Sequence, residues 1–166
     1  METRKVAYAV VLTAMAVALS PFFIPVGPVK AFPVQSMVNV LSGVILGPWY
    51  ALAVAIAASV IRNATGTGTL FAFPGSMIGA FLAGYLYVFT RSIYVAALGE
   101  VVGTGFIAAF VSTLLVAPAF LNRTMDATAL VIPFLAAAVA GALIGVMGLA
   151  VLQRAGVVKI AKATKE

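Results

Sequence analysis

The stretch AFPVQSMVNVLSGVILGPWYALAVAIAASVI, Ala31 to Ile61, decides the fold because its 31 residues include no charged side chain. As one helix, rising about 1.5 Å per residue, it would be about 46 Å long, whereas the hydrocarbon core of a bilayer is about 30 Å thick. The stretch is therefore too long for one membrane crossing and short for two.

A break point is visible in the motif GPWY. Gly47 can end one helix, and Pro48 can start the next without losing a needed hydrogen bond. We predict two short helices here, with Trp49 and Tyr50 at the membrane–water interface. Each is shorter than the about 17 residues of a full crossing, so the connecting segments must fill the outer depth of the membrane. Irregular backbone is tolerated there where it is buried in protein or lines a cavity, which predicts a pocket that opens outward.

The composition indicates a membrane protein. Of 166 residues, 64% are apolar and 8% are charged, whereas a soluble domain has about 25% charged residues. We therefore expect an all-α integral protein of the cell membrane, surrounded by lipid, with one domain over residues 1–166. The net charge of +6 comes from basic residues at the ends of apolar stretches, which favours membrane orientation over nucleic-acid binding.

Several chemistries are excluded by missing residues. The sequence has no Cys, no His and no Gly-Lys-Ser/Thr motif, so it lacks a thiolate, the commonest proton shuttle and metal ligand, and a P-loop. Paired carboxylates are also missing. We expect no enzymatic activity, no cofactor and no metal site.

The number of crossings follows from the basic residues. Both chain ends are basic, with Arg4 and Lys5 at the start and Arg154 near the end, followed by Lys159, Lys162 and Lys165. Lys and Arg concentrate on the cytoplasmic side, so both ends should face the cytoplasm, which requires an even number of crossings. Six crossings put seven basic residues inside and only Lys30, Arg62 and Arg123 outside. The predicted helices are 5–24, 34–46, 48–62, 74–90, 96–118 and 128–152.

The first apolar run has the outline of a signal peptide, which is an alternative to a first helix. However, the uncharged run Val6–Ile24 has 19 residues, enough to span, and Pro21 directly follows the sequence ALS. We favour a retained first helix.

Two outer segments contain the candidate ligand contacts. The segment Pro25–Asn39 has three prolines and Gly27, which prevent a continuous helix, and the segment Arg62–Ser76 contains Gly66 and Gly68. Aromatic rings, amides and hydroxyls alternate in both. The candidates are Phe32, Gln35, Asn39, Arg62, Asn63, Thr67, Thr69, Phe73 and Ser76. The plainer alternatives are a packing hydrogen bond for Asn39 and a snorkelling side chain at the interface for Arg62.

Glu100 is the one acidic residue inside a predicted span, near its inner end. An ionisable group at membrane depth is a functional candidate, and Thr104 lies one turn further along on the same face. A structural pair between Glu100 and Arg91 is the alternative.

The first helix contains two small-xxx-small pairs, Ala14 with Ala18 and Ala16 with Ser20. Such pairs allow helices to approach closely. We expect this helix to contact a partner protein, because nothing else in the sequence couples substrate binding to an energy source.

Three motifs carry a resemblance to a known family. They are SPFFIPVGPVKAFPVQSMVNVLSGVILGPWYA (Ser20–Ala51), RNATGTGTLFAFPGSMIGAFLAGYLY (Arg62–Tyr87) and GEVVGTGFIAAF (Gly99–Phe110). The chain resembles the S components of energy-coupling-factor vitamin transporters, and most closely the ThiW group, which is associated with thiazole salvage for thiamine synthesis. Ser36 stands where the pattern of that group is expected to have histidine.

The resemblance implies a six-helix subunit that captures a vitamin precursor from outside, here hydroxyethyl-methylthiazole. Such a subunit associates with a transmembrane coupling subunit and two cytoplasmic ATPases. In the family an Ala-xxx-Ala pair on the first helix meets the coupling subunit, and Ala14 and Ala18 match it. The outer loops and the last three helices form the family's pocket.

Three other functions remain open. An S component for an anionic vitamin would suit the outer cations, and its binding would weaken at high salt. A small homo-oligomeric secondary transporter would show internal repeats or a charge at mid-depth. A membrane enzyme is the weakest alternative.

Overall fold

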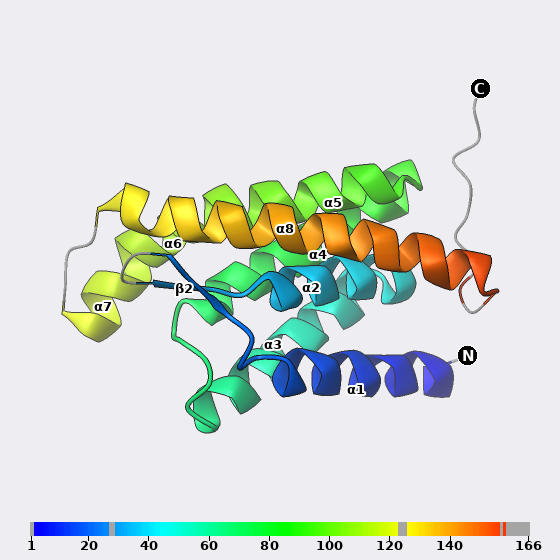
Figure 1. The fold of residues 1–166 in the computed structure, drawn as a ribbon, viewed down its shortest axis with the longest axis horizontal. Coiled ribbons are helices and arrows are strands. Elements are labelled where there is room, and N and C mark those ends of the chain that lie inside the picture. The colour runs from blue at the N-terminus through cyan, green and yellow to red at the C-terminus, as the bar shows by residue number, and fades with distance from the viewer. Residues whose placement is uncertain (1, 27–28, 123–125, 157, 159–166) are drawn as a thin grey trace.

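The computed structural model describes residues 2–26, 29–122, 126–156 and 158. Within them the chain forms six helical rods and one short β-hairpin (Figure 1). Five of the rods are single helices: α1 (Glu2–Ala18), α2 (Pro33–Leu46), α3 (Pro48–Ala64), α4 (Ala72–Thr90) and α8 (Ala127–Arg154). Arg123, Lys159, Lys162 and Lys165, used above to count crossings, lie outside the described residues.

The sixth rod changes its winding along its length. It consists of α5 (Ile93–Val102), the π-helical segment η1 (Gly103–Ala108), α6 (Ala109–Val111), a second π-helical segment η2 (Ser112–Val116) and α7 (Ala117–Leu121). Single π turns inside helices often occur at functional sites, because the wider turn changes which side chains face a neighbour.

The hairpin was not predicted. Strand β1 (Ile24–Val26) pairs antiparallel with β2 (Val29–Ala31), with Ile24 opposite Ala31. The predicted helix 5–24 is wrong in its last part, since α1 ends at Ala18. Two local causes end it: Pro21 disfavours helical backbone at Ser20, and the Ser20 hydroxyl donates to the carbonyl of Val17 at 2.7 Å.

The break between two helices is confirmed at Gly47, but only α2, with 14 residues, is shorter than a full crossing, because α3 has 17 residues. The φ of Gly47 is +87°, a backbone conformation that glycine adopts without strain, and Pro48 is the first residue of α3. The other rods begin and end within three residues of the predicted bounds; they are Pro33–Leu46, Pro48–Ala64, Ala72–Thr90, Ile93–Leu121 and Ala127–Arg154.

Helix α2 lies at the centre of the bundle and contacts α1, α3, α4, α5 and α8. Glycines permit the close approach. A Cβ at Gly43 would lie 2.7 Å from the backbone nitrogen of Gly84 on α4, and one at Gly141 on α8 would lie 2.6 Å from Cβ of Ser36. Small residues of this kind are typical of helix contacts in membranes.

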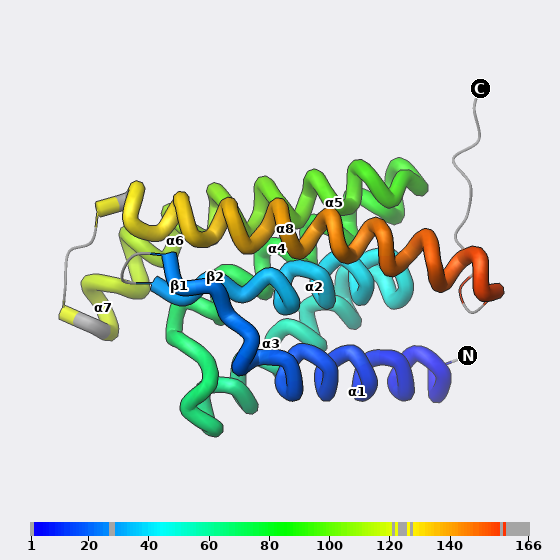
Figure 2. The backbone as a smooth tube through the Cα atoms, viewed as in Figure 1, coloured from blue at the N-terminus to red at the C-terminus, as the bar shows by residue number. Residues whose placement is uncertain are grey.

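In the described part of the chain, three helical segments are long and apolar enough to cross a membrane: Ala72–Thr90, Ile93–Phe120 and Thr128–Arg154. Helix α2 is apolar but has only 14 residues. The outer faces of the rods expose large apolar side chains, including Leu114, Phe120, Leu143 and Met147, which suits contact with lipid. Figure 2 shows that α1 begins and α8 ends at one end of the bundle, while the hairpin lies at the other.

Candidate functional site: a hollow at the hairpin end of the bundle

A small hollow of about 40 Å³ lies where the hairpin meets α2, α3, α4, η1 and α8. It is well below the volumes of about 300–1,000 Å³ that ligand pockets have when occupied, so a bound molecule requires its side chains to move apart. The residues that line it are Lys30, Ala31, Phe32, Gln35, Ser36, Asn39, Arg62, Thr69, Phe71, Ala72, Gly75, Ser76, Thr104, Pro133, Phe134 and Ala137.

One wall of the hollow is a chain of hydrogen bonds. Arg62 Nη1 donates to Gln35 Oε1 at 2.8 Å, Gln35 Nε2 donates to Asn39 Oδ1 at 3.2 Å, and Asn39 Nδ2 donates to Glu100 Oε1 at 3.1 Å. Gln35 and Asn39 lie one turn apart on α2, so the helix itself sets their spacing. All four side chains are buried. Each amide is thereby fixed with its oxygen towards Arg62 and its nitrogen towards Glu100.

Thr104 connects this chain to α4. Its Oγ1 lies 2.8 Å from Glu100 Oε1 and 2.8 Å from the carbonyl oxygen of Gly75. The close approach depends on Gly79, where any Cβ would overlap the side chains of Glu100 and Thr104. Thr104 belongs to η1, so a π-helical turn presents this hydroxyl to the hollow.

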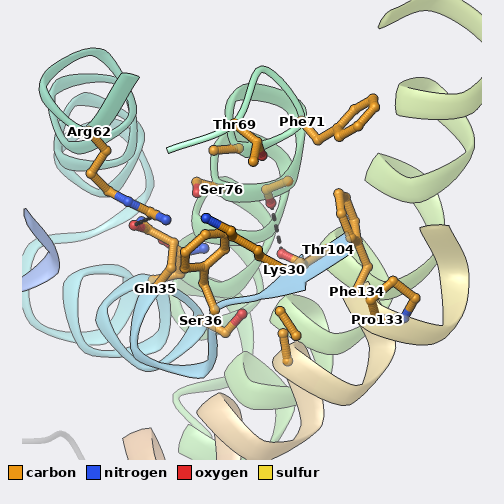
Figure 3. Close-up of a pocket in the computed structure, with 16 residues that line it drawn as sticks. Lys30, Gln35, Ser36, Arg62, Thr69, Phe71, Ser76, Thr104, Pro133 and Phe134 are labelled. Atoms are coloured by element: carbon orange, nitrogen blue, oxygen red, sulfur yellow. Dashed lines mark hydrogen bonds between the residues drawn. The ribbon is translucent and has the colours of Figure 1, made fainter. Parts of the chain in front are cut away.

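The opposite wall is apolar. Figure 3 shows Arg62 and Gln35 on one side of the hollow and Phe71 and Phe134 on the other. Pro133 and Ala137, also from α8, extend the apolar side. The hollow therefore combines ring faces with a few fixed polar groups, which is the usual chemistry of a small-molecule site.

The hairpin adds a row of alternating cations and rings. Lys30 Nζ lies 4.4 Å from the ring centroid of Phe23, the rings of Phe23 and Phe32 are 6.1 Å apart, and the guanidinium of Arg62 lies 4.1 Å from the Phe32 ring. Cations within about 6 Å of an aromatic face are attracted to it. The row fixes β2 against the end of α3.

Seven of the eleven predicted ligand residues line the hollow: Phe32, Gln35, Asn39, Arg62, Thr69, Ser76 and Thr104. Arg62 does not snorkel outward, because its side chain is 1% exposed and is directed into the bundle. Asn39 does make a packing hydrogen bond, to Glu100, and also faces the hollow.

The other four predicted residues lie outside the lining. Asn63 is in the last turn of α3, where its Nδ2 donates to the carbonyls of Ser59 and Thr69. Thr67 accepts from the Ser20 hydroxyl at 3.0 Å and so connects the second loop to the end of α1. Phe73 is on α4 and does not reach the hollow, and Glu100 lies behind Asn39 and Thr104.

Glu100 lies deeper in the bundle than its position in the sequence predicts. Its helix starts at Ile93, three residues before the predicted start, and its carboxylate lies against Gly79 in the middle of α4. The partners of Glu100 are Asn39 and Thr104 rather than Arg91, whose side chain is exposed. The alternative of a structural pair with Arg91 is wrong.

The residues that sequence reasoning missed are mostly apolar. Phe134 and Ala137 lie in a long apolar helix, where no local contrast distinguishes them from lipid-facing neighbours, and Pro133 is a proline inside the same helix that was not selected from the sequence. Lys30 is predicted only as an outer cation, and Ser36 stands out only as a departure from the family motif. Phe71 belongs to the second outer segment, where only Phe73 was selected.

The two small-residue pairs of α1 face in opposite directions. Ala16 and Ser20 are buried in the bundle, whereas Ala14 and Ala18 are exposed. Among the described residues no group of three His, Cys, Asp or Glu side chains could hold a metal ion.

The family comparison matches nearly the whole chain. A family model described as thiamine-precursor transporter protein (ThiW) matches residues 6–155. No curated protein gives a significant match. The match spans all six rods, and transport of a thiamine precursor implies a multi-pass membrane protein rather than an enzyme. The chain therefore belongs to the ThiW family of thiamine-precursor transporter proteins.

Proposed function

We propose that this chain is the substrate-binding S component of an energy-coupling-factor transporter and that it captures hydroxyethyl-methylthiazole from outside the cell. The observation that carries the proposal is the hollow, which has ring faces on one wall and fixed amides and hydroxyls on the other. The ThiW match supports a thiamine precursor as the substrate.

The chemistry of a thiazole suits the two walls. Its flat ring needs an aromatic face, which Phe71 and Phe134 supply, and its nitrogen and hydroxyl need a few convergent hydrogen-bonding groups. Gln35, Asn39 and Ser76 offer such groups. Ser36, in the place where histidine was expected, gives this pocket a smaller and neutral side chain.

We further propose six crossings with both chain ends in the cytoplasm. This topology is supported by the start of α1 and the end of α8 at one end of the bundle (Figure 2). Lys30 and Arg62, assigned outside, both line the hollow at the opposite end. The hollow then opens to the outside.

In this proposal the energy comes from partners: a transmembrane coupling subunit and two cytoplasmic ATPases. The exposed pair Ala14 and Ala18 is the proposed contact with the coupling subunit. Val10 and Val11, each 62% exposed, extend the same apolar surface of α1.

Isothermal titration of the purified chain tests the function. We expect tight binding of hydroxyethyl-methylthiazole and weak or no binding of thiamine, riboflavin and pantothenate. If none of the four binds tightly, the proposal fails.

A secondary transporter is a second candidate because Glu100 lies at greater depth than expected. In that case the chain alone would move substrate. Uptake of labelled thiazole by proteoliposomes that contain only this chain would favour this candidate, whereas uptake that requires the coupling subunit and ATPases would favour the S component.

A further inference from the structure

The guanidinium of Arg62 has one edge without a hydrogen-bond partner. Nη1 donates to Gln35, but no acceptor among the described residues lies within reach of Nε or Nη2, although the side chain is 1% exposed. Nε and Nη2 belong to the same edge of the planar group, so their N–H bonds point in parallel.

Buried donors without acceptors are unfavourable, and a charged group makes the cost larger. Two parallel N–H donors match two oxygens of a carboxylate or a phosphate, which accept such pairs in bidentate geometry. A hydroxyl or a ring nitrogen offers a single acceptor atom and satisfies only half of this edge.

The charges around the hollow also favour an anion. Two cations, Lys30 and Arg62, line it. Glu100 does not line the hollow. Its Oε1 is occupied by Asn39 and Thr104, and its Oε2 is buried without a hydrogen-bond partner among the described residues. Two amides, of Gln35 and Asn39, separate Glu100 from Arg62.

Phe32 lies against the guanidinium. Its ring lies 4.1 Å from the guanidinium, and it directly follows the hairpin strand β2 as the N-cap residue of α2. Nε and Nη2 are buried, and Arg62 and Phe32 both line the hollow. Rotation of an interface side chain such as Phe32 is a common change on ligand binding.

We propose that the precursor is recognised as an anion: a small aromatic molecule with a carboxylate or phosphate group held by the free edge of Arg62, its ring lying between Phe71 and Phe134. This inference rests on the proposed role as an S component for a thiazole precursor of thiamine, and it replaces the neutral alcohol proposed above by an anionic thiazole.

Titration of the full-length purified chain with three probes tests it: hydroxyethyl-methylthiazole, its phosphate monoester, and a thiazole carboxylate of similar size. We expect one of the anionic probes to bind at least about tenfold more tightly than the neutral alcohol, because hydrogen bonds to a charged group are worth that factor or more. Its binding should weaken at high salt, while that of the alcohol should not. The two anionic probes distinguish carboxylate from phosphate recognition.

Substitutions at Arg62 distinguish paired hydrogen bonding by Nε and Nη2 from a general effect of positive charge. Arg62→Gln should abolish the preference for the anionic probe. Arg62→Lys retains the charge but not the two parallel N–H donors, so it should reduce the preference. Arg154→Gln, at an exposed cation at the end of α8, should leave the preference unchanged. The preference is a ratio measured on one preparation, so partial misfolding does not alter it. If Arg62→Gln yields no folded protein, Arg62→Lys and the salt dependence decide.

The outcomes separate the two proposals. If the alcohol binds tightly and at least as well as both anions, or if Arg62→Lys leaves the preference intact, the anion inference is overturned while the proposed function stands. If no thiazole probe binds, both fail.

Discussion

Helices α1 and α2 are both mainly apolar, yet they occupy opposite environments. In α1 only Leu12 and Ala16 of 17 residues are buried, whereas 11 of the 14 residues of α2 are buried. The difference lies in the residues that interrupt the apolar pattern. Within its apolar run α1 has one polar side chain, Thr13, whereas α2 contains Gln35, Ser36, Asn39 and Ser42. In lipid, polar side chains and glycine mark the buried helix, because apolar residues suit both environments.

The largest effect is expected at the contact of α2 with α8. Gly141→Ala would place a methyl group 2.6 Å from Cβ of Ser36 and against the carbonyl of Pro33. We expect a loss of about 3 kcal/mol in the free energy of unfolding, the upper part of the usual range for overpacking, because backbone blocks the methyl group. Thermal unfolding in detergent measures it. Gly148→Ala, whose Cβ would meet only Leu41 at 3.8 Å, is the control; equal stability of the two variants would contradict the central position of α2.

The next effect concerns the polar residues of α2. Asn39→Leu would leave Gln35 Nε2 and Glu100 Oε1 each without one buried partner. We expect a loss of about 2 kcal/mol in unfolding free energy and a loss of thiazole binding. Ile45→Leu on the same helix should retain both. A variant at Asn39 that binds normally would show that the amide chain is only a packing feature.

A smaller effect is expected where α1 meets the second outer loop. Ser20→Ala removes the hydrogen bonds to Thr67 and to the carbonyl of Val17, and we expect a loss of about 1 kcal/mol. Thr128→Ala, exposed at the start of α8, should be neutral. The same comparison by hydrogen exchange should show faster exchange of the loop amides in Ser20→Ala; unchanged exchange would mean that this contact does not hold the loop.

The smallest effect on stability is expected on the exposed face of α1. Ala14→Leu should change the free energy of unfolding by less than about 0.5 kcal/mol and leave thiazole binding intact. It should nevertheless prevent co-purification of the coupling subunit, since a larger side chain keeps the helices apart. Ala53→Leu, exposed on α3, is the control. Normal co-purification with Ala14→Leu would remove α1 as the contact.

Much of the architecture could be predicted because its signals are local. Glycine and proline marked the break at Gly47, and long uncharged runs marked the remaining rods. The end of α1 could not be predicted from hydropathy, because residues 19–24 continue the apolar run after the helix has ended. Strands of three residues are too short to show an alternating pattern, so the hairpin was missed as well.

The residues of the site also fall into those that the sequence predicts and those that it does not. Gln35, Asn39, Arg62 and Thr104 could be found because a polar group within an apolar span requires a partner. Phe134 and Ala137 could not, since nothing local separates an apolar residue at a pocket from one in lipid. Long-range contacts decided the remaining cases: the depth of Glu100 depends on Gly79, and the inward direction of Arg62 depends on Gln35.

The single residue between α2 and α3 has a consequence for biogenesis. A helix of 14 residues rises about 21 Å, less than the about 30 Å of the hydrocarbon core, so α2 is a poor candidate for independent insertion. With only Gly47 as a turn, we expect α2 and α3 to enter the bilayer together as a helical hairpin. Arg62 and Gln35 both belong to this hairpin, so their hydrogen bond needs no contact from α4 or α8.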